Sequence, residues 1–155
     1  FQLLGFLDVS NRTAISRQQM KIWTEQDIIE YLGETDDVRP YIADADCVIL
    51  PSYREGLPRT LLEAVAMGRP IIATDVTGCR EVVEHGVNGY LCKVRDANDL
   101  SDKMKDMIKL TPYERKEMGL RGRKKVENEF DEQIILTGII EIINQLLDTS
   151  EGSRN

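Results

Sequence analysis

The alternation of short apolar runs with helical patterns constrains this chain more than any other feature of its sequence. Several of the runs are almost continuously apolar, which is typical of parallel strands that are covered on both faces. The alternation predicts an α/β fold, with a parallel sheet of about five strands and helices on both faces. The expected strands are 1–6, 28–33, 47–51, 70–75 and 89–94, and helical patterns lie near 16–25, 36–45, 59–67 and 79–85.

The pattern changes after residue 94, where helical segments follow one another without a strand. The expected helices are Ala97–Leu110, Pro112–Asn128 and Asp131–Leu147, and residues 150–155 are expected to form a disordered tail. The third helix carries one apolar stripe at helical spacing. We expect this stripe to face the core, and docking on another domain is the alternative. The stripe consists of residues 135, 136, 139, 140, 143, 146 and 147.

The charge balance argues against nucleic acid as a partner, because the formal net charge is −7. One basic cluster runs against this trend within the second of the three helices. It is expected to be a solvated helix face, and contact with an anionic membrane surface or acceptor is the alternative. The cluster consists of Arg115, Lys116, Arg121, Arg123, Lys124 and Lys125.

The cysteines and the single histidine offer little chemistry. Cys47, Cys79 and Cys92 are odd in number and widely spaced, so neither a disulfide framework nor a zinc site is expected. Cys47 and Cys92 fall in apolar strands and are expected to be buried thiols, which suits a reducing compartment. His85 lies in EHGVNG, a pattern typical of a helix end and turn, and is expected to be a surface loop residue.

The stretch YREGLPRTLLEAVAMG follows the apolar run CVILP and begins a helix near Pro58. Ligands of open α/β sheets bind beyond the carboxyl ends of the strands, which is where this loop is expected to lie. The amino end of the helix presents free backbone N–H groups and a positive dipole end, which favour phosphate. Gly56 would let a ligand approach the backbone closely.

Two glutamates of this stretch raise alternatives that the pattern leaves open. If Pro58 is the first helical residue, Glu63 sits in the second turn of an apolar helix, and a ribose could supply the bonds that a buried carboxylate needs. If Thr60 is the N-cap, Glu63 completes a capping box instead. Glu55 is either an exposed loop acid or a carboxylate at the mouth of the site.

These residues resemble a known family. The stretch E-G-L-P-R-T-L-L-E is similar to the E-x7-E motif of glycosyltransferase family 4, with Glu55 and Glu63 as the two glutamates. The flanking stretches DVRPYIADADCVILPS and EAVAMGRPIIATDVTGCREVVEHGVNGYL match as well, so the similarity covers roughly residues 1–110.

The resemblance implies half of a GT-B architecture, in which two Rossmann-like domains face each other across a cleft. Residues 1–149 would form the C-terminal domain that binds the donor nucleotide. The first strand of that domain, with an arginine and a lysine that clamp the diphosphate, and the N-terminal acceptor domain would be absent. The implied activity is transfer of a sugar from a nucleotide-sugar with retention of configuration, without a cofactor or metal. The chain alone should bind nucleotide weakly and transfer nothing.

The resemblance also implies roles for individual residues. Glu55 would be the catalytic residue, touching the donor sugar and stabilising positive charge at the anomeric carbon. Glu63 would bond the ribose hydroxyls. The base would lie near Leu32 and Gly33. Backbone amides would hold the diphosphate and sugar, and the available donors are Gly56, Leu57, Arg59 and Thr60, because Pro58 has no N–H.

One departure from the family pattern points to a subgroup. The loop after PIIATD often reads Gly-Gly in the family, whereas here it is Thr77-Gly78-Cys79. This variant resembles bacterial transferases that build surface polysaccharides or lipid-linked oligosaccharides from UDP-sugars. The implied partners are a nucleotide-sugar and a glycan or lipid-linked acceptor. The implied location is cytoplasmic, with peripheral contact at the inner face of the membrane.

Two other readings compete. A non-enzymatic binding module of the receiver or flavodoxin type would need an acidic cluster after its first strand, where Asp8 stands alone, and a lysine that ATDVTG lacks. Another GT-B enzyme, such as an epimerase or a phosphorylase, is the third reading.

Overall fold

The computed structural model describes residues 1–7 and 14–152, without the side chains of 135 and 148–152. Asp8, on which the receiver reading depends, lies outside these residues. The chain divides into two units, Phe1–Pro40 and Tyr41–Asn155.

The first unit holds a small parallel sheet. Strand β1 (Gln2–Leu3) pairs with β2 (Glu30–Tyr31), and helix α1 (Arg17–Glu25) connects them. The Ser16 side chain caps α1 by accepting a hydrogen bond from the Gln19 N–H at 3.1 Å. These strands are shorter than the runs 1–6 and 28–33 that the sequence predicts.

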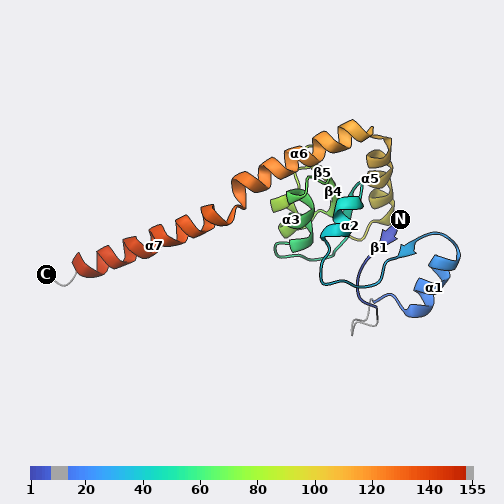
Figure 1. The fold of residues 1–155 in the computed structure, drawn as a ribbon, viewed down its shortest axis with the longest axis horizontal. Helices are drawn as coiled ribbons and strands as arrows, with labels where there is room; N and C mark the ends of the chain where they lie inside the picture. The colour runs from blue at the N-terminus through green and yellow to red at the C-terminus, as the bar shows by residue number, and fades with distance from the viewer. Residues whose placement is uncertain (8–13, 153–155) are drawn as a thin grey trace. The chain divides into compact units, whose positions relative to one another are not determined.

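The second unit is built on a three-stranded parallel sheet in the order β3-β4-β5. Helix α3 connects β3 to β4, and α4 connects β4 to β5 (Figure 1). The five expected strands are therefore present and parallel, but they form two sheets rather than one. The bounds are α2 Arg39–Asp44, β3 Val48–Leu50, α3 Arg59–Ala66, β4 Ile71–Thr74, α4 Thr77–Val82 and β5 Gly89–Cys92.

The core of this unit is centred on β4, whose four residues are all buried. Ile72 packs with Met107 of α5 (Ala97–Lys109) and Met118 of α6 (Pro112–Glu129). Side chains alternate along a strand, so the buried Ile71 faces the other side, where α3 contacts β3 and β4. The expectation of helices on both faces is met in this unit (Figure 1).

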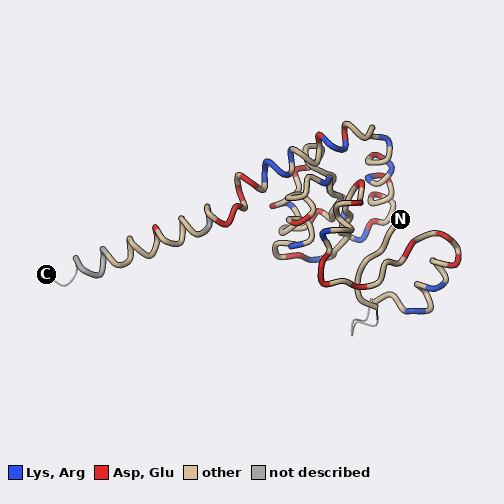
Figure 2. Tube along the Cα trace, in the orientation of Figure 1, with Lys and Arg blue, Asp and Glu red and all other residues tan. Residues whose placement is uncertain are grey.

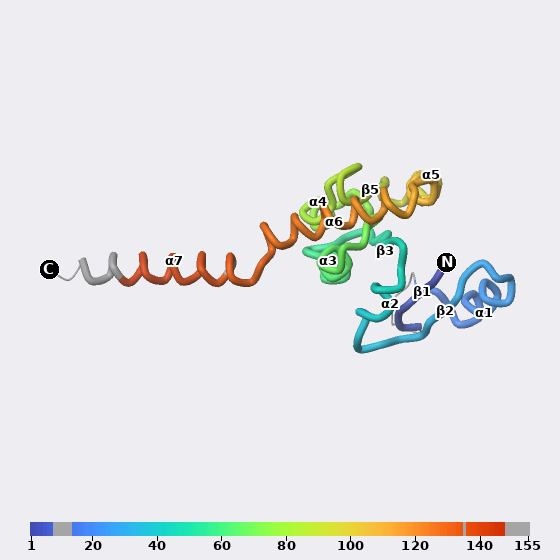
Figure 3. Tube along the Cα trace, turned by 45° about the horizontal axis from the view of Figure 1, so that its top comes forward, coloured from blue at the N-terminus to red at the C-terminus, as the bar shows by residue number. Residues whose placement is uncertain are grey.

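Helix α6 begins and packs as its sequence dictates. Pro112 occupies the first turn, and the side chains and backbones of Thr111 and Glu114 form a reciprocal capping box. The helix runs alongside α3 (Figures 1 and 3). Gly119 permits this close approach, because a methyl group at position 119 would lie 1.9 Å from the Gly68 carbonyl oxygen.

The basic cluster of α6 is largely engaged by its own unit, with acidic residues interleaved along the helix (Figure 2). Arg115 donates to the Leu110 carbonyl oxygen at 2.5 Å, and Arg123 donates to the Ala66 carbonyl oxygen at 2.8 Å. Lys125 pairs with Glu129 at 2.7 Å. The expectation of a merely solvated face is wrong for Arg115 and Arg123, which tie α6 to its surroundings, whereas the Lys125 pair lies within the helix.

Helix α7 (Glu132–Gly152) corrects the expectation of a core-facing stripe. Its apolar side chains are exposed at residues 134, 136, 139, 140, 142, 143, 146 and 147. Ile135 has no described side chain. The helix continues to Gly152, into the segment expected to be a tail, and residues 153–155 lie outside the described residues. None of the helices in the described ranges is both long and apolar enough to span a bilayer.

Candidate functional site

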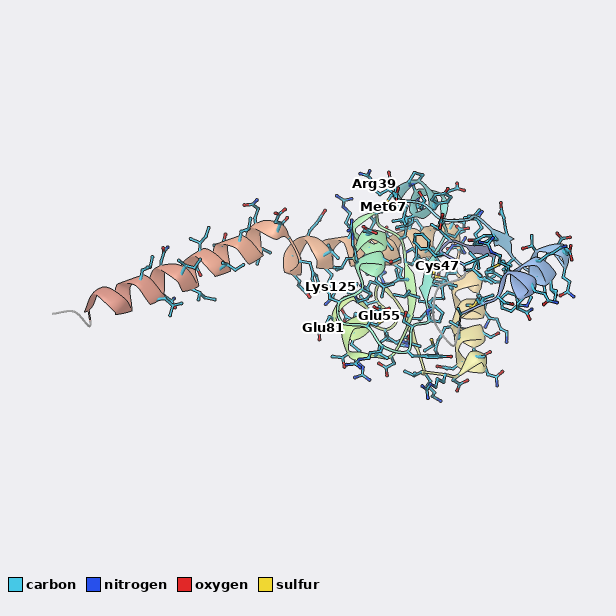
Figure 4. All side chains as sticks on the ribbon, turned by 90° about the horizontal axis from the view of Figure 1, so that it is seen from below. Arg39, Cys47, Glu55, Met67, Glu81 and Lys125 are labelled. Atoms are coloured by element: carbon cyan, nitrogen blue, oxygen red, sulfur yellow. The ribbon has the colours of Figure 1, made fainter. Side chains whose placement is uncertain are left out.

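A pocket of about 490 Å³ opens where β3 and β4 end at their carboxyl edge. The loop after β3 supplies one wall, and the first turn of α4 supplies the other. Glu55 lies before α3 and Met67 lies after it, at opposite ends of that helix (Figure 4). The pocket is lined by Tyr53, Arg54, Glu55, Asp75, Val76, Thr77 and Arg80.

Two contacts hold the Glu55 loop in place. The hydroxyl of Thr74, at the end of β4, donates a hydrogen bond to the Ser52 carbonyl oxygen and ties the two strand ends together. Gly78 of α4 lies directly against the loop, because a methyl group there would come within 1.6 Å of the Gly56 carbonyl oxygen. The loop is therefore seated on the first turn of α4.

The charges inside the pocket are arranged in a defined way. Arg80 Nε donates to Asp75 Oδ1 at 2.5 Å, and Arg80 Nη2 donates to the Asp75 carbonyl oxygen at 3.3 Å. This guanidinium lowers the pKa of the Asp75 carboxyl below its ordinary value. Glu55 is half-buried at the same pocket. In the part of the chain that the structure describes, Arg54 has no ion-pair partner.

Tyr53 forms the aromatic part of the pocket wall. Its side chain is 57% exposed, and the guanidinium carbon of Arg95 lies 5.1 Å from the centroid of its ring. This is the geometry of a cation–π interaction. Arg95 belongs to the turn between β5 and α5 and has a positive φ of 60°.

The amino end of α3 resolves the two helix registers left open by the sequence. Pro58 is the N-cap and Arg59 is the first helical residue, so both the register with Pro58 inside the helix and that with Thr60 as N-cap are wrong. The Pro58 carbonyl oxygen accepts from the N–H groups of Leu61 and Leu62, at 3.1 and 3.2 Å. Among the described residues, the amides of Gly56, Leu57, Arg59 and Thr60 donate to no protein acceptor.

Glu63 is neither a capping-box residue nor a buried charge. Its side chain is 27% exposed, and its Oε1 accepts a hydrogen bond from Arg59 Nε at 2.8 Å. Arg59 is 89% exposed and lies one turn earlier on α3. The premise that the carboxylate needs a ligand to satisfy it is therefore wrong, because an i,i+4 ion pair does so.

The remaining ionisable candidates stay outside the chemistry. His85 is exposed, as expected, and its Nδ1 accepts the Leu91 N–H at 2.9 Å. All three cysteines are free thiols. Burial raises the pKa of Cys79 to about 11 and that of Cys47 to about 12, so neither is a thiolate at neutral pH. Cys92 is buried as expected, whereas Cys47 lies just before β3 and is only partly buried.

The structure brings some of the predicted site residues together. Glu55 lines the pocket, and Gly56, Leu57, Arg59 and Thr60 follow it at the start of α3. Glu63 lies on α3 and is not among the lining residues. Leu32 and Gly33 follow β2 in the first unit, where the Leu32 N–H donates to the Leu3 carbonyl oxygen at 2.9 Å. Their contact with a base stays a prediction.

Sequence reasoning missed Asp75 and Arg80, together with Tyr53, Arg54 and Thr77. A signal for Asp75 was present, because it ends the run PIIATD, whose strand was expected in the same sheet as CVILP. The carboxyl ends of neighbouring parallel strands share one edge of the sheet. Arg80 had no such signal, because only the turn of α4 aims it back toward Asp75.

The fold agrees with comparisons to known proteins. N-acetyl-alpha-D-glucosaminyl L-malate synthase of Bacillus anthracis is 37% identical over 112 residues, which are 72% of this chain and 29% of that protein. The capsular polysaccharide biosynthesis glycosyltransferase CapM of Staphylococcus aureus is 28% identical over 150 residues, which are 97% of this chain and 39% of that protein. HepE from Anabaena, solved in complex with UDP, has a TM-score of 0.74 at 26% identity and covers 83% of this chain.

The chain spans only 29% and 39% of the length of these two relatives, and 35% of the HepE chain. The family model described as glycosyl transferases group 1 matches residues 5–109, which include the whole Glu55–Glu63 motif and the pocket. This confirms the recognition made from that motif and sets aside the receiver-type reading. The chain belongs to the glycosyl transferases group 1 family.

Proposed function

We propose that this chain is the donor-binding part of a glycosyltransferase that transfers a sugar from a UDP-sugar with retention of configuration. The observation that carries the proposal is the pocket of about 490 Å³ at the carboxyl edge of β3 and β4, with the half-buried Glu55 in its wall. The similarity to HepE, which was solved with UDP, supports the choice of base.

The diphosphate is proposed to lie at the amino end of α3. The amides of Gly56, Leu57, Arg59 and Thr60 are available there, and their partial positive charge favours an anion. Glu63 would accept hydrogen bonds from the ribose hydroxyls. Arg59 must then share or release the carboxylate, which its exposure of 89% allows. Leu32 and Gly33 remain the proposed contacts of the base.

The transfer itself needs few groups from this chain. The bond between the anomeric carbon and the diphosphate oxygen breaks, and a bond from that carbon to the acceptor oxygen forms. The acceptor proton passes to the leaving diphosphate, which carries the charge released. Glu55, a carboxylate at the pocket, would stabilise the positive charge that develops on the sugar while both bonds are weak. His85 Nδ1 is not free to act as a base, because it already accepts a hydrogen bond from the Leu91 N–H.

The acceptor is proposed to be a glycan or a lipid-linked glycan, and the enzyme is proposed to work in the cytoplasm at the inner face of the membrane. CapM, named for capsular polysaccharide biosynthesis, supports the choice of acceptor. Because this chain spans at most 39% of the curated relatives' length quoted above, we propose that a second domain binds the acceptor.

An NMR titration of the chain with UDP, GDP and ADP tests the donor assignment. We expect UDP to shift the amide resonances of residues 32 and 33, of residues 55–63 and of the first turn of α4, with weaker effects from GDP and ADP. Saturating shifts elsewhere on the chain would contradict the assignment of the site. A preference for GDP or ADP would contradict the assignment of the base. Silence with all three nucleotides would contradict donor binding by this chain.

A further inference from the structure

Tyr53 and Arg95 form a pair that the proposed roles of Glu55 and Glu63 do not use. Tyr53 lines the pocket, whereas Arg95 is not among the lining residues, although its guanidinium carbon lies 5.1 Å from the centroid of the tyrosine ring. The Tyr53 ring therefore contacts Arg95 and also forms part of the pocket wall. Arg95 can therefore act on the pocket wall through the position of that ring.

The backbone of Arg95 gives independent support for a special role. Its φ of 60° lies in the left-handed region, which costs free energy for a residue with a Cβ. Such conformations persist where surrounding contacts compensate for them, and they concentrate at functional sites. The stacking of Arg95 on Tyr53 is a favourable interaction of this kind.

The chemistry of the pocket wall suits a sugar better than a phosphate or a base. The ring of Tyr53 offers an apolar surface for the C–H groups on one face of a pyranose. The carboxylates of Glu55 and Asp75 and the hydroxyl of Thr77 offer hydrogen-bond acceptors for its hydroxyl groups. An apolar surface with a few convergent polar groups is the usual composition of a small-molecule site.

We propose that Arg95 is a positioning residue that holds the Tyr53 ring as the surface on which the transferred hexose packs. The inference rests on the proposed function, because it assumes that a UDP-sugar occupies the pocket. The Tyr53–Arg95 pair contributes to affinity for the sugar moiety and not to affinity for UDP.

Calorimetric titration of the full chain with UDP, UDP-glucose and UDP-N-acetylglucosamine tests this claim. For the wild type, we expect at least one UDP-sugar to bind more tightly than UDP. Tyr53→Leu and Arg95→Gly should weaken binding of that UDP-sugar three- to tenfold and change UDP binding by less than twofold. Tyr53→Phe keeps the ring and should behave like the wild type. Arg95→Lys keeps the cation and should restore most of the affinity lost in Arg95→Gly.

The Arg95→Gly variant also separates positioning from folding. Glycine adopts a positive φ without strain, so its Tm should not fall below that of the wild type. Equal weakening of UDP and UDP-sugar, no weakening in Tyr53→Leu or Arg95→Gly, or a fall in Tm with the lost affinity would each overturn the inference and leave the proposed function in place. A wild-type chain that binds none of the three ligands would overturn both.

Discussion

Gly78 and Gly56 are in backbone contact across the pocket wall: a methyl group at position 78 would lie 1.6 Å from the Gly56 carbonyl oxygen and 2.8 Å from that of Glu55. The first turn of α4 thus supports the loop that presents Glu55. We expect Gly78→Ala to lower the free energy of unfolding by about 1–3 kcal/mol, because backbone rather than a flexible side chain must move. Urea unfolding measures this change.

Gly56→Ala is the matched control for this contact. A methyl group at position 56 would have nothing within 4 Å, so the free energy of unfolding should change by less than about 1 kcal/mol. UDP-sugar binding should weaken nevertheless, because the added methyl group obstructs the approach of the diphosphate to the amides. Equal stability losses in the two variants would show that the contact does not seat the loop.

Glu63 can be tested separately for ligand binding and for stability. We expect Glu63→Gln to cost about 1.5–3 kcal/mol of UDP affinity for each charged hydrogen bond that is lost. Its effect on the free energy of unfolding should be below about 0.5 kcal/mol, because the Arg59–Glu63 pair is an exposed i,i+4 ion pair. Calorimetric titration and urea unfolding of one variant give both numbers.

Arg59→Gln separates the ion pair from the proposed ribose contact. This variant removes the same salt bridge but keeps the carboxylate, so UDP affinity should hold or improve as the competing partner is lost. If Arg59→Gln weakens UDP binding as strongly as Glu63→Gln, the ion pair itself would be what the nucleotide needs.

The Asp75–Arg80 pair predicts a pH dependence. Arg80 lowers the pKa of Asp75 in the folded chain, so the pair adds stability at neutral pH and loses it as the pH falls from the ordinary value of 3.8 through the folded pKa. Arg80→Gln should therefore lower the stability at neutral pH only slightly, because both side chains are about half exposed. The difference from the wild type should shrink in acid.

Carboxyl NMR titration measures this shift directly. The pKa of Asp75 should rise toward its ordinary value in Arg80→Gln. Lys105→Gln removes the salt bridge to Asp102, outside the pocket, and should leave the titration of Asp75 unchanged. An Asp75 pKa that stays low in Arg80→Gln would mean that another group holds it down.

Replacement by alanine should have opposite effects on stability at two helical glycines, one packed between α6 and α3 and one in open space on α7. Gly119→Ala would place a methyl group 1.9 Å from the Gly68 carbonyl oxygen, so the variant should lose about 1–3 kcal/mol of stability. Gly138→Ala in α7 meets nothing within 4 Å and should gain about 0.5–1 kcal/mol of helix stability. Thermal unfolding of both variants checks the pair, and a stabilising Gly119→Ala would contradict the close packing.

The sequence predicted the elements of this fold better than their arrangement. Apolar runs such as PIIATD identify buried strands, and Pro112 marks the start of α6, because both depend on local chemistry. Pairing of strands depends on residues far apart in the chain, which explains why one sheet was expected where two form. The apolar residues of α7 recur at helical spacing, but this spacing alone does not show whether they pack against the core, and in the structure they are exposed.

The sequence predicted residues of the candidate site only where they belong to a recognisable motif. Glu55 was assigned from the motif and lines the pocket, whereas the contacts of Glu63 were not foreseen. Its partner Arg59 stands four residues earlier, a spacing that the helix register alone could have flagged. Arg80 and Arg95 were missed because their roles depend on where two turns aim long side chains.

The pocket has a kinetic consequence that follows from its charges. Two arginines and two carboxylates, Arg54 and Arg80 with Glu55 and Asp75, cancel in formal charge, while the chain as a whole carries −7. For the proposed UDP-sugar donor, the net charge of this chain predicts repulsion at long range rather than steering, and salt screens that repulsion beyond about 8 Å at physiological strength. Encounter should become faster, not slower, as ionic strength rises, so capture depends on donor concentration and on short-range contacts alone.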